Sequence, residues 1–230
     1  MSMFRTTVTA IATALICCLA MPAMAKDEAK KISGAVTVLK AFNATPKRGI
    51  PPMLVSEAAG IAIFPGAAKL DFMTKGRSAN GILLTQDDEG NWSNPVFVNL
   101  SGGTIGWQIV SDPMDIVLLF NDSELVDRVL NGKLVLKSNI KVGMGPIGQS
   151  IKGATAEELA VDVFSYTRSH GEVTEMVLAG TTMHLNASAN AAFYDKPKVS
   201  AEEIVDGTVA KSTPDLTSLH KILSGYAGKK

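Results

Sequence analysis

The chain has 230 residues, of which 22 are lysine or arginine, 22 are aspartate or glutamate and 46% are hydrophobic. This composition indicates a globular protein and excludes a disordered one, because enough apolar side chains are present to build a core. The formal net charge is zero, which excludes an overall basic field, so no nucleic-acid partner is predicted.

Residues 1–25 have the pattern of a secretory signal peptide. Arg5 is the only charged residue in this segment, an apolar run covers residues 8–20, and Ala23-Met24-Ala25 forms an A-x-A cleavage site. The apolar run is too short for a membrane-spanning helix. We therefore expect cleavage after Ala25 and export to the periplasm, with a buried N-terminal helix as the alternative.

Both cysteines of the chain, Cys17 and Cys18, lie inside this segment. A bacterial lipid anchor needs a small residue directly before the modified cysteine. Ile16 precedes Cys17, and Cys17 precedes Cys18, so a lipid anchor at either position is a poor match. The mature chain would contain no cysteine, which excludes a disulfide, a thiol nucleophile and a cysteine-based metal site.

Residues 26–50 are predicted to form an amphipathic helix, at 27–43, followed by a basic linker. Ile32, Leu39 and Phe42 recur at helical spacing on one face of this helix. Two partners are possible for the apolar face. It can pack on the sheet of the same domain, or it can lie in the headgroup region of a membrane while nearby lysines meet lipid phosphates.

From residue 60 onward the sequence changes to short apolar runs separated by turn residues, which is typical of strands. A short helix precedes them, at 53–58. Gly90-Asn91 provides the turn of a hairpin between two of the runs. Strands are predicted at 60–66, 68–73, 80–86, 95–100, 104–110 and 115–120.

The second half of the chain mixes both patterns. A helix is predicted at 123–132, with Ser123 as its N-cap and Gly132 as its C-cap. Strands are predicted at 133–143 and 172–185, while 156–169 is ambiguous, although its end alternates like a strand. Further helices are predicted at 186–195, which begins with a cap-like Asn186, and near 200–205 and 214–224.

These patterns together predict an α+β fold: a mostly antiparallel sheet or barrel-like core, with an N-terminal amphipathic helix and several short helices. One domain is predicted over residues 51–195. Residues 196–230 are predicted to form a C-terminal helical tail that packs on this domain or flanks it.

No catalytic or metal-binding motif is present, so no enzyme activity, cofactor or metal is predicted. His170, His184 and His220 lack the short spacing of metal ligands. No G-x-S-x-G nucleophile motif and no P-loop occur. Asp87-Asp88-Glu89 is interpreted as a solvated turn; calcium binding is the alternative, although the full spacing of a calcium loop is missing.

The segment "KVGMGPIGQS", residues 141–150, contains a G-x-G-x-x-G pattern, which in dinucleotide enzymes cradles a pyrophosphate. That site needs a helix opening within the motif. Here Pro146 lies inside the pattern, Gly153 breaks the next turn, and the following residues do not resemble a βαβ unit. We therefore predict that Gly145 and Gly148 shape the backbone between strands and bind no nucleotide.

Several motifs occur in the order seen in the SYLF-domain family, also called the lipid-binding SYLF or actin-binding-type domain. The resemblance covers roughly residues 50–195, and it rests on all of these motifs occurring together. The motifs are Ile61-Ala62-Ile63-Phe64-Pro65, Trp92-Ser93-x-Pro95, Ser101-Gly102-Gly103-x-x-Gly106, Gly145-Pro146-x-Gly148 and Tyr166-Thr167-Arg168.

The resemblance implies binding to anionic phospholipids, which are phosphoinositides for eukaryotic members, some of which also bind actin filaments. It implies no catalysis. Bacterial members are usually exported, and this chain resembles an exported bacterial member, which would not meet cytoplasmic actin. The predicted function is therefore non-catalytic binding of anionic phospholipid headgroups in the periplasm. The alternative is a protein-interaction or stress-related scaffold of the cell envelope that does not bind lipid.

Candidate lipid-binding residues follow from the distribution of charge. Basic side chains near an anionic surface are attracted to it, and arginine can bind a phosphate in bidentate fashion. The membrane-facing apolar candidates are Ile32, Leu39 and Phe42, while Phe72, Trp92, Trp107 and Phe193 are assigned to the core. The basic candidates are Lys40, Lys47, Arg48, Lys69, Lys75 and Arg77.

Overall fold

The computed structural model describes the chain in several ranges. The described residues are 26–44, 49–67, 78–102, 114–137, 139–148, 154–169, 172–174, 178 and 180–227. The signal segment lies outside these ranges, and so do the strands predicted at 68–73 and 104–110.

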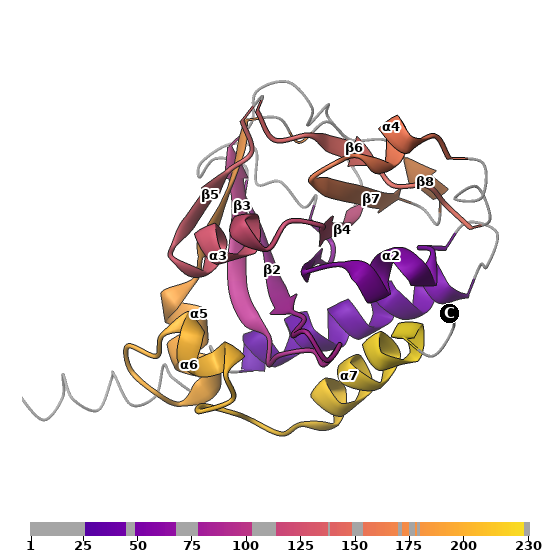
Figure 1. The fold of residues 1–230 in the computed structure, drawn as a ribbon. Helices are drawn as coiled ribbons and strands as arrows, with labels where there is room; N and C mark the ends of the chain where they lie inside the picture. Colours follow the sequence, from indigo (N-terminus) through magenta and orange to yellow (C-terminus); the bar gives the residue numbers. More distant parts are fainter. Residues whose placement is uncertain are drawn as a thin grey trace, which may run out of the picture.

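The described strands form a single curved sheet (Figure 1). They are β1 (Gly60–Phe64), β2 (Ser78–Thr85), β3 (Val96–Gly102), β4 (Met114–Phe120), β5 (Lys133–Val135), β6 (Val142–Met144), β7 (Val163–Ser169), β8 (Glu172–Thr174) and β9 (Thr181–Leu185). Their order is β5-β9-β3-β2-β1-β4-β7-β6, and β8 pairs with β7. Every described pairing is antiparallel except that of β6 with β7.

Helices cover the sheet and extend along its lower edge in Figure 1. The N-terminal helix, residues 26–43, comes first. It is followed by α2 (Pro52–Glu57), α3 (Ser123–Leu130), α4 (Ala156–Leu159), α5 (Ala187–Tyr194), α6 (Ala201–Val205) and α7 (Pro214–Ala227). The predicted α+β class, the mostly antiparallel sheet, the N-terminal helix and the short helices are thus confirmed.

Local sequence signals account for several of these elements. The predicted hairpin is confirmed: β2 pairs with β3, and Gly90 in the turn has φ +85°. Asn186 caps α5, accepting a hydrogen bond from the backbone N of Ala189 at 3.1 Å. The predicted cap of α3 is wrong by one residue, because Asp122, whose carboxylate accepts from the Glu124 backbone N, takes the place assigned to Ser123.

The N-terminal helix packs on the sheet along its length. The side chain of Lys31 lies over the ring of Phe97 in β3, and Phe42 makes an edge-to-face ring contact with Tyr166 in β7. Between them, Gly34 approaches Pro65 so closely that an added Cβ would be 2.9 Å from the Pro65 Cβ. The helix therefore spans several strands and closes one side of the core.

The glycine motif that begins in β6 shapes the backbone, as predicted. Tyr166 lies where a Gly145 Cβ would be, and its hydroxyl donates to the carbonyl of Pro146 at 3.1 Å. Gly148 has φ +57° and donates its N–H to the carbonyl of Gly49 at 2.8 Å. The space beside Gly145 is therefore filled by a tyrosine ring.

The expectation that the residues after the glycine motif form no βαβ unit is corrected. Because β6 and β7 run parallel with α4 between them, the segment does form a small βαβ-like crossover. The crossover still differs from a dinucleotide site, since α4 is a four-residue helix that begins only at Ala156. The crossover could not be recognised from the sequence, because β6 and α4 are both very short.

Candidate functional site

The structure separates the predicted lipid-binding residues into three groups. Lys40 lies exposed near the end of the N-terminal helix. Ile32, Leu39 and Phe42 are buried, with exposed fractions of 1%, 0% and 2%. Lys47, Arg48, Lys69, Lys75 and Arg77 lie outside the described residues.

The burial of the helix corrects the membrane-facing assignment of its apolar residues. The amphipathic pattern was sound, but the apolar face packs into the domain core together with residues of the sheet. Hydrophobic side chains that fill a core cannot at the same time insert into a membrane. In the described structure the apolar face of this helix therefore packs on the sheet, which was the first of the two alternatives considered.

Lys40 contributes to a groove between the end of the N-terminal helix and α7, called here the basic groove. The groove has a volume of about 470 Å³. It is lined by Lys40, Asn43, Ser218, Lys221, Ile222, Gly225 and Tyr226.

The sequence of α7 explains why lysine faces this groove. Leu216, Leu219, Leu223 and Tyr226 recur at helical spacing and are buried, so they fix one face of α7 on the domain. Lys221 lies on the opposite side and is exposed. The N-terminal helix and α7 both bury their apolar faces, so Lys40 of the first and Lys221 of the second remain beside the groove.

The charge of the basic groove is positive. The described part of its lining contains two lysines and no carboxylate. Among the described residues, neither lysine forms an ion pair. Both helices end near the groove, and their terminal carbonyls together offset roughly one positive charge, because each helix C-terminus acts as about half a negative charge.

The inner wall of the groove is uncharged. Tyr226 has an exposed fraction of 3%. Burial raises the pKa of Tyr226 to about 12, and the side chain of Asn43 opposes part of this shift. The phenol therefore stays protonated in neutral solution, and among the described lining residues the charge comes from the lysines. Such a groove can attract a phosphate.

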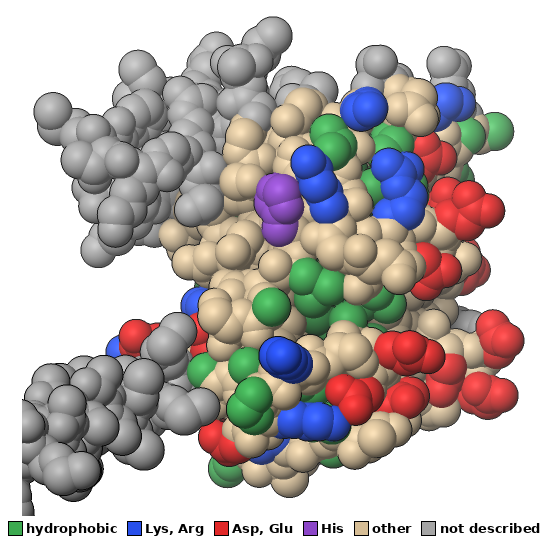
Figure 2. All heavy atoms as spheres, turned by 90° about the vertical axis from the view of Figure 1, so that its left-hand side faces the viewer, with side chains coloured by type: hydrophobic (Ala, Val, Ile, Leu, Met, Phe, Trp, Pro, Cys, Tyr) green, Lys and Arg blue, Asp and Glu red, His purple; other side chains and the backbone are tan. Residues whose placement is uncertain are grey.

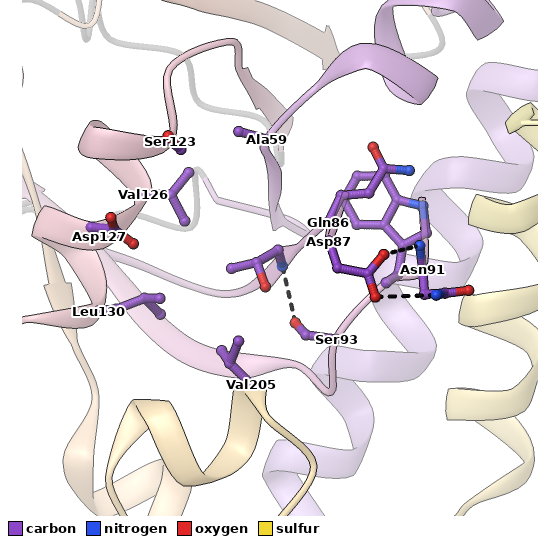
Figure 3. Close-up of a pocket in the computed structure, with 12 residues that line it drawn as sticks. Ala59, Gln86, Asp87, Asn91, Ser93, Ser123, Val126, Asp127, Leu130 and Val205 are labelled. Carbon is purple, nitrogen blue, oxygen red and sulfur yellow. Dashed lines mark hydrogen bonds between the residues drawn. The ribbon is translucent and has the colours of Figure 1, made fainter. Parts of the chain in front are cut away.

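A second cavity, called here the acidic pocket, lies between the β2–β3 turn, α3 and α6 (Figure 3). Its volume is about 350 Å³. Its walls include Ala59, Trp92, Val126, Leu130 and Val205, and its polar lining consists of Thr85, Gln86, Asp87, Asn91, Ser93, Ser123 and Asp127.

Hydrogen bonds fix the turn that forms one side of the acidic pocket. The Asp87 carboxylate accepts from the backbone N of Asn91 at 2.7 Å and from its side-chain amide at 3.1 Å. These bonds, the backbone one first, hold the pKa of Asp87 below its ordinary value. Asp87 is therefore a fixed negative charge in neutral solution.

The described residues were also compared with the requirements of a metal site and of a membrane-spanning helix. No group of three histidine, cysteine, aspartate or glutamate side chains there is placed to hold a metal ion. The described helices also include none with the length and apolar character needed to cross a membrane.

Sequence reasoning missed most of both cavities. It proposed Lys40, but Lys221 lay in the predicted tail, where no pattern indicated that its helix would lie beside the N-terminal helix. Asp87 was assigned to a solvated turn and Trp92 to the core, while Asp127 had no assigned role. Helical periodicity could have placed Lys221 and Asp127 on exposed faces, but not in a cavity.

Comparison with known proteins places the chain among relatives that contain more than this domain. The family model "Ysc84: Las17-binding protein actin regulator" matches residues 101–226. The SH3 domain-containing YSC84-like protein 1 of Xenopus laevis is 28% identical over 91% of this chain and 63% of its own length. Its human namesake is 27% identical over 91% and 61%, and Protein YSC84 of Saccharomyces cerevisiae is 28% identical over 90% and 45%. The chain thus spans less than two thirds of these relatives.

Proposed function

Because the chain belongs to the Ysc84 family, the SYLF-domain family, we propose that it is a non-catalytic binding protein that engages anionic phospholipid headgroups through the basic groove. The observation that carries this proposal is the pair of lysines, Lys40 and Lys221, which face one groove whose described lining residues include no carboxylate. The family is named for binding and regulation, which agrees with a function without catalysis.

The groove would act by electrostatic attraction. Each lysine near an anionic membrane contributes about 1 kcal/mol, so the pair contributes about 2 kcal/mol, or about 30-fold in affinity. Lys47 and Arg48 follow Asn43 closely in the sequence and would add to this attraction, as would Lys69, Lys75 and Arg77. Because the apolar face of the N-terminal helix is buried, binding should be peripheral and sensitive to salt.

The proposed location is the periplasm, after cleavage behind Ala25. This part rests on the signal-like segment at residues 1–25. An exported chain would meet anionic phospholipids on the membrane surfaces around it but would not meet cytoplasmic actin. Lipid is therefore the proposed partner, whereas the actin regulation named in the family description is not proposed for this chain.

Vesicle co-sedimentation of the mature protein tests the function. We expect binding that rises with the phosphatidylglycerol fraction in phosphatidylcholine vesicles and falls as salt is added. The variant Lys40→Gln/Lys221→Gln should bind about 30-fold more weakly at low salt, because two cationic contacts are lost. Lys137→Gln is the matched control, since Lys137 is an exposed lysine just after β5, away from α7 (Figure 1).

Two results would contradict the proposal. If Lys137→Gln weakens binding as much as the double variant, the attraction is a general surface effect and the groove is not the site. If the folded wild-type protein binds no vesicle of any composition, lipid binding itself is wrong. The protein-interaction scaffold of the cell envelope would then be favoured.

A further inference from the structure

The acidic pocket has a composition opposite to that of the basic groove. Among the residues that the structure describes, its lining includes Asp87 and Asp127 and no lysine, arginine or histidine. Figure 3 shows the two carboxylate residues on opposite sides of the pocket, one on the β2–β3 turn and one on α3. We propose that this pocket binds a lysine or arginine side chain presented by an extended segment of a protein partner.

The surroundings extend the negative field beyond the pocket. Exposed carboxylates continue along all three elements that form it: Asp88 and Glu89 in the turn, Glu124 on α3 and Asp206 directly after α6. Figure 2 shows acidic side chains gathered along one edge of this part of the molecule. Charge complementarity therefore selects a basic partner, and it would also speed its association.

The walls suit the long stem of a basic side chain. Val126, Leu130, Val205 and the largely buried Trp92 give the pocket an apolar lining. Lysine and arginine bury their methylene groups on such surfaces while the charged end reaches polar atoms. The volume of about 350 Å³ is at the lower end of the range of ligand pockets, about 300–1,000 Å³, which fits one side chain and its adjoining backbone.

The polar atoms favour an organic cation with directed donors over a metal ion. Both oxygens of Asp87 already accept hydrogen bonds from Asn91, which holds the carboxylate in place. Asp127 is exposed and forms no ion pair within the described part of the chain. A guanidinium or ammonium group that enters the pocket can donate a charge-assisted hydrogen bond to a carboxylate of this lining.

The pocket is separate from the groove proposed for lipid, although α7 borders both regions. His220 of α7 lies 3.0 Å from the carbonyl of Ser93 in the acidic pocket, whereas Ser218 and Lys221 line the groove. A membrane rich in anionic lipid would be repelled by Asp87, Asp127 and the carboxylates around them. The pocket is therefore suited to a protein segment and not to that membrane.

An NMR titration of the mature protein with two peptides tests this inference. The probe is acetyl-Gly-Ala-Arg-Ala-Gly-amide, and its control has citrulline in place of arginine, which keeps the shape and removes the charge. We expect saturable shifts at the Trp92 indole N–H and at the backbone amides of Thr85, Gln86 and Val126 with the arginine peptide. Asp127→Asn should weaken this binding about tenfold or more, because a charged hydrogen-bond partner is lost.

Glu57→Gln is the matched control, because Glu57 is an exposed carboxylate on α2 that does not line the pocket. It should leave the peptide affinity unchanged, and Asp127→Asn should leave vesicle binding unchanged. Equal shifts with the citrulline peptide, equal weakening by Glu57→Gln, or shifts confined to other surfaces would overturn the inference. The vesicle assay does not depend on this site, so either proposal can fail without the other.

Discussion

Phe42→Ala is expected to lower the free energy of unfolding by about 3–5 kcal/mol, the usual cost of deleting a buried aromatic ring. Phe42 has an exposed fraction of 2%, its ring centroid lies 6.3 Å from that of Tyr166, and the Arg168 guanidinium lies over it at 5.9 Å. Removing the ring would leave a cavity between the N-terminal helix and β7. Denaturant unfolding followed by circular dichroism measures the change.

Thr37→Ala is the control on the same helix, because Thr37 is exposed and its hydroxyl donates only to the Ser33 carbonyl. Its expected effect is within about 0.5 kcal/mol. The Phe42→Ala protein that remains folded should bind anionic vesicles as the wild type does. A stability change below about 1 kcal/mol together with a loss of vesicle binding would instead place Phe42 on the membrane.

Gly145→Ala is expected to destabilise the protein by about 3 kcal/mol, at the upper end of the range for overpacking. The added methyl group would overlap the ring of Tyr166. That ring cannot easily move, because Tyr166 is fully buried in β7 and its hydroxyl donates to Pro146 at 3.1 Å. The Gly145 N–H also donates to the Ser165 carbonyl at 3.1 Å, so the backbone is held as well. Thermal unfolding compares the variant with the wild type.

Gly225→Ala serves as the control for the glycine prediction. Gly225 lies in α7 and has open space where a Cβ would be. The substitution should be neutral or stabilise the helix by up to about 1 kcal/mol, because alanine favours helix over glycine. Similar losses for both variants would show that Tyr166 does not restrict position 145.

The elements that sequence reasoning predicted well carry their own local signals. The β2–β3 hairpin has a glycine turn, α5 has its Asn186 cap, and α7 shows leucines at helical spacing. The parallel pairing of β6 with β7 was not predictable in this way, since it joins two segments across a long connection. Periodicity shows that a face is apolar, but it does not identify what covers that face.

The same limit applies to the candidate sites. Lys40 was identified from its own helix, but its partner Lys221 comes from the other end of the chain and meets it only through packing. Asp87 and Asp127 similarly come together because α3 folds back beside the β2–β3 turn. Charge is visible in a sequence, whereas a cavity that combines two distant charges depends on the tertiary fold.

An amide NMR titration of the mature protein with phosphatidylglycerol-containing bicelles tests the central claim, headgroup binding in the basic groove, most directly. We expect the strongest shifts at Lys40, Asn43, Lys221 and Gly225, with their loss in Lys40→Gln/Lys221→Gln and upon addition of salt. Shifts concentrated on β5, α3 or α6, with the residues of the groove unchanged, would contradict it.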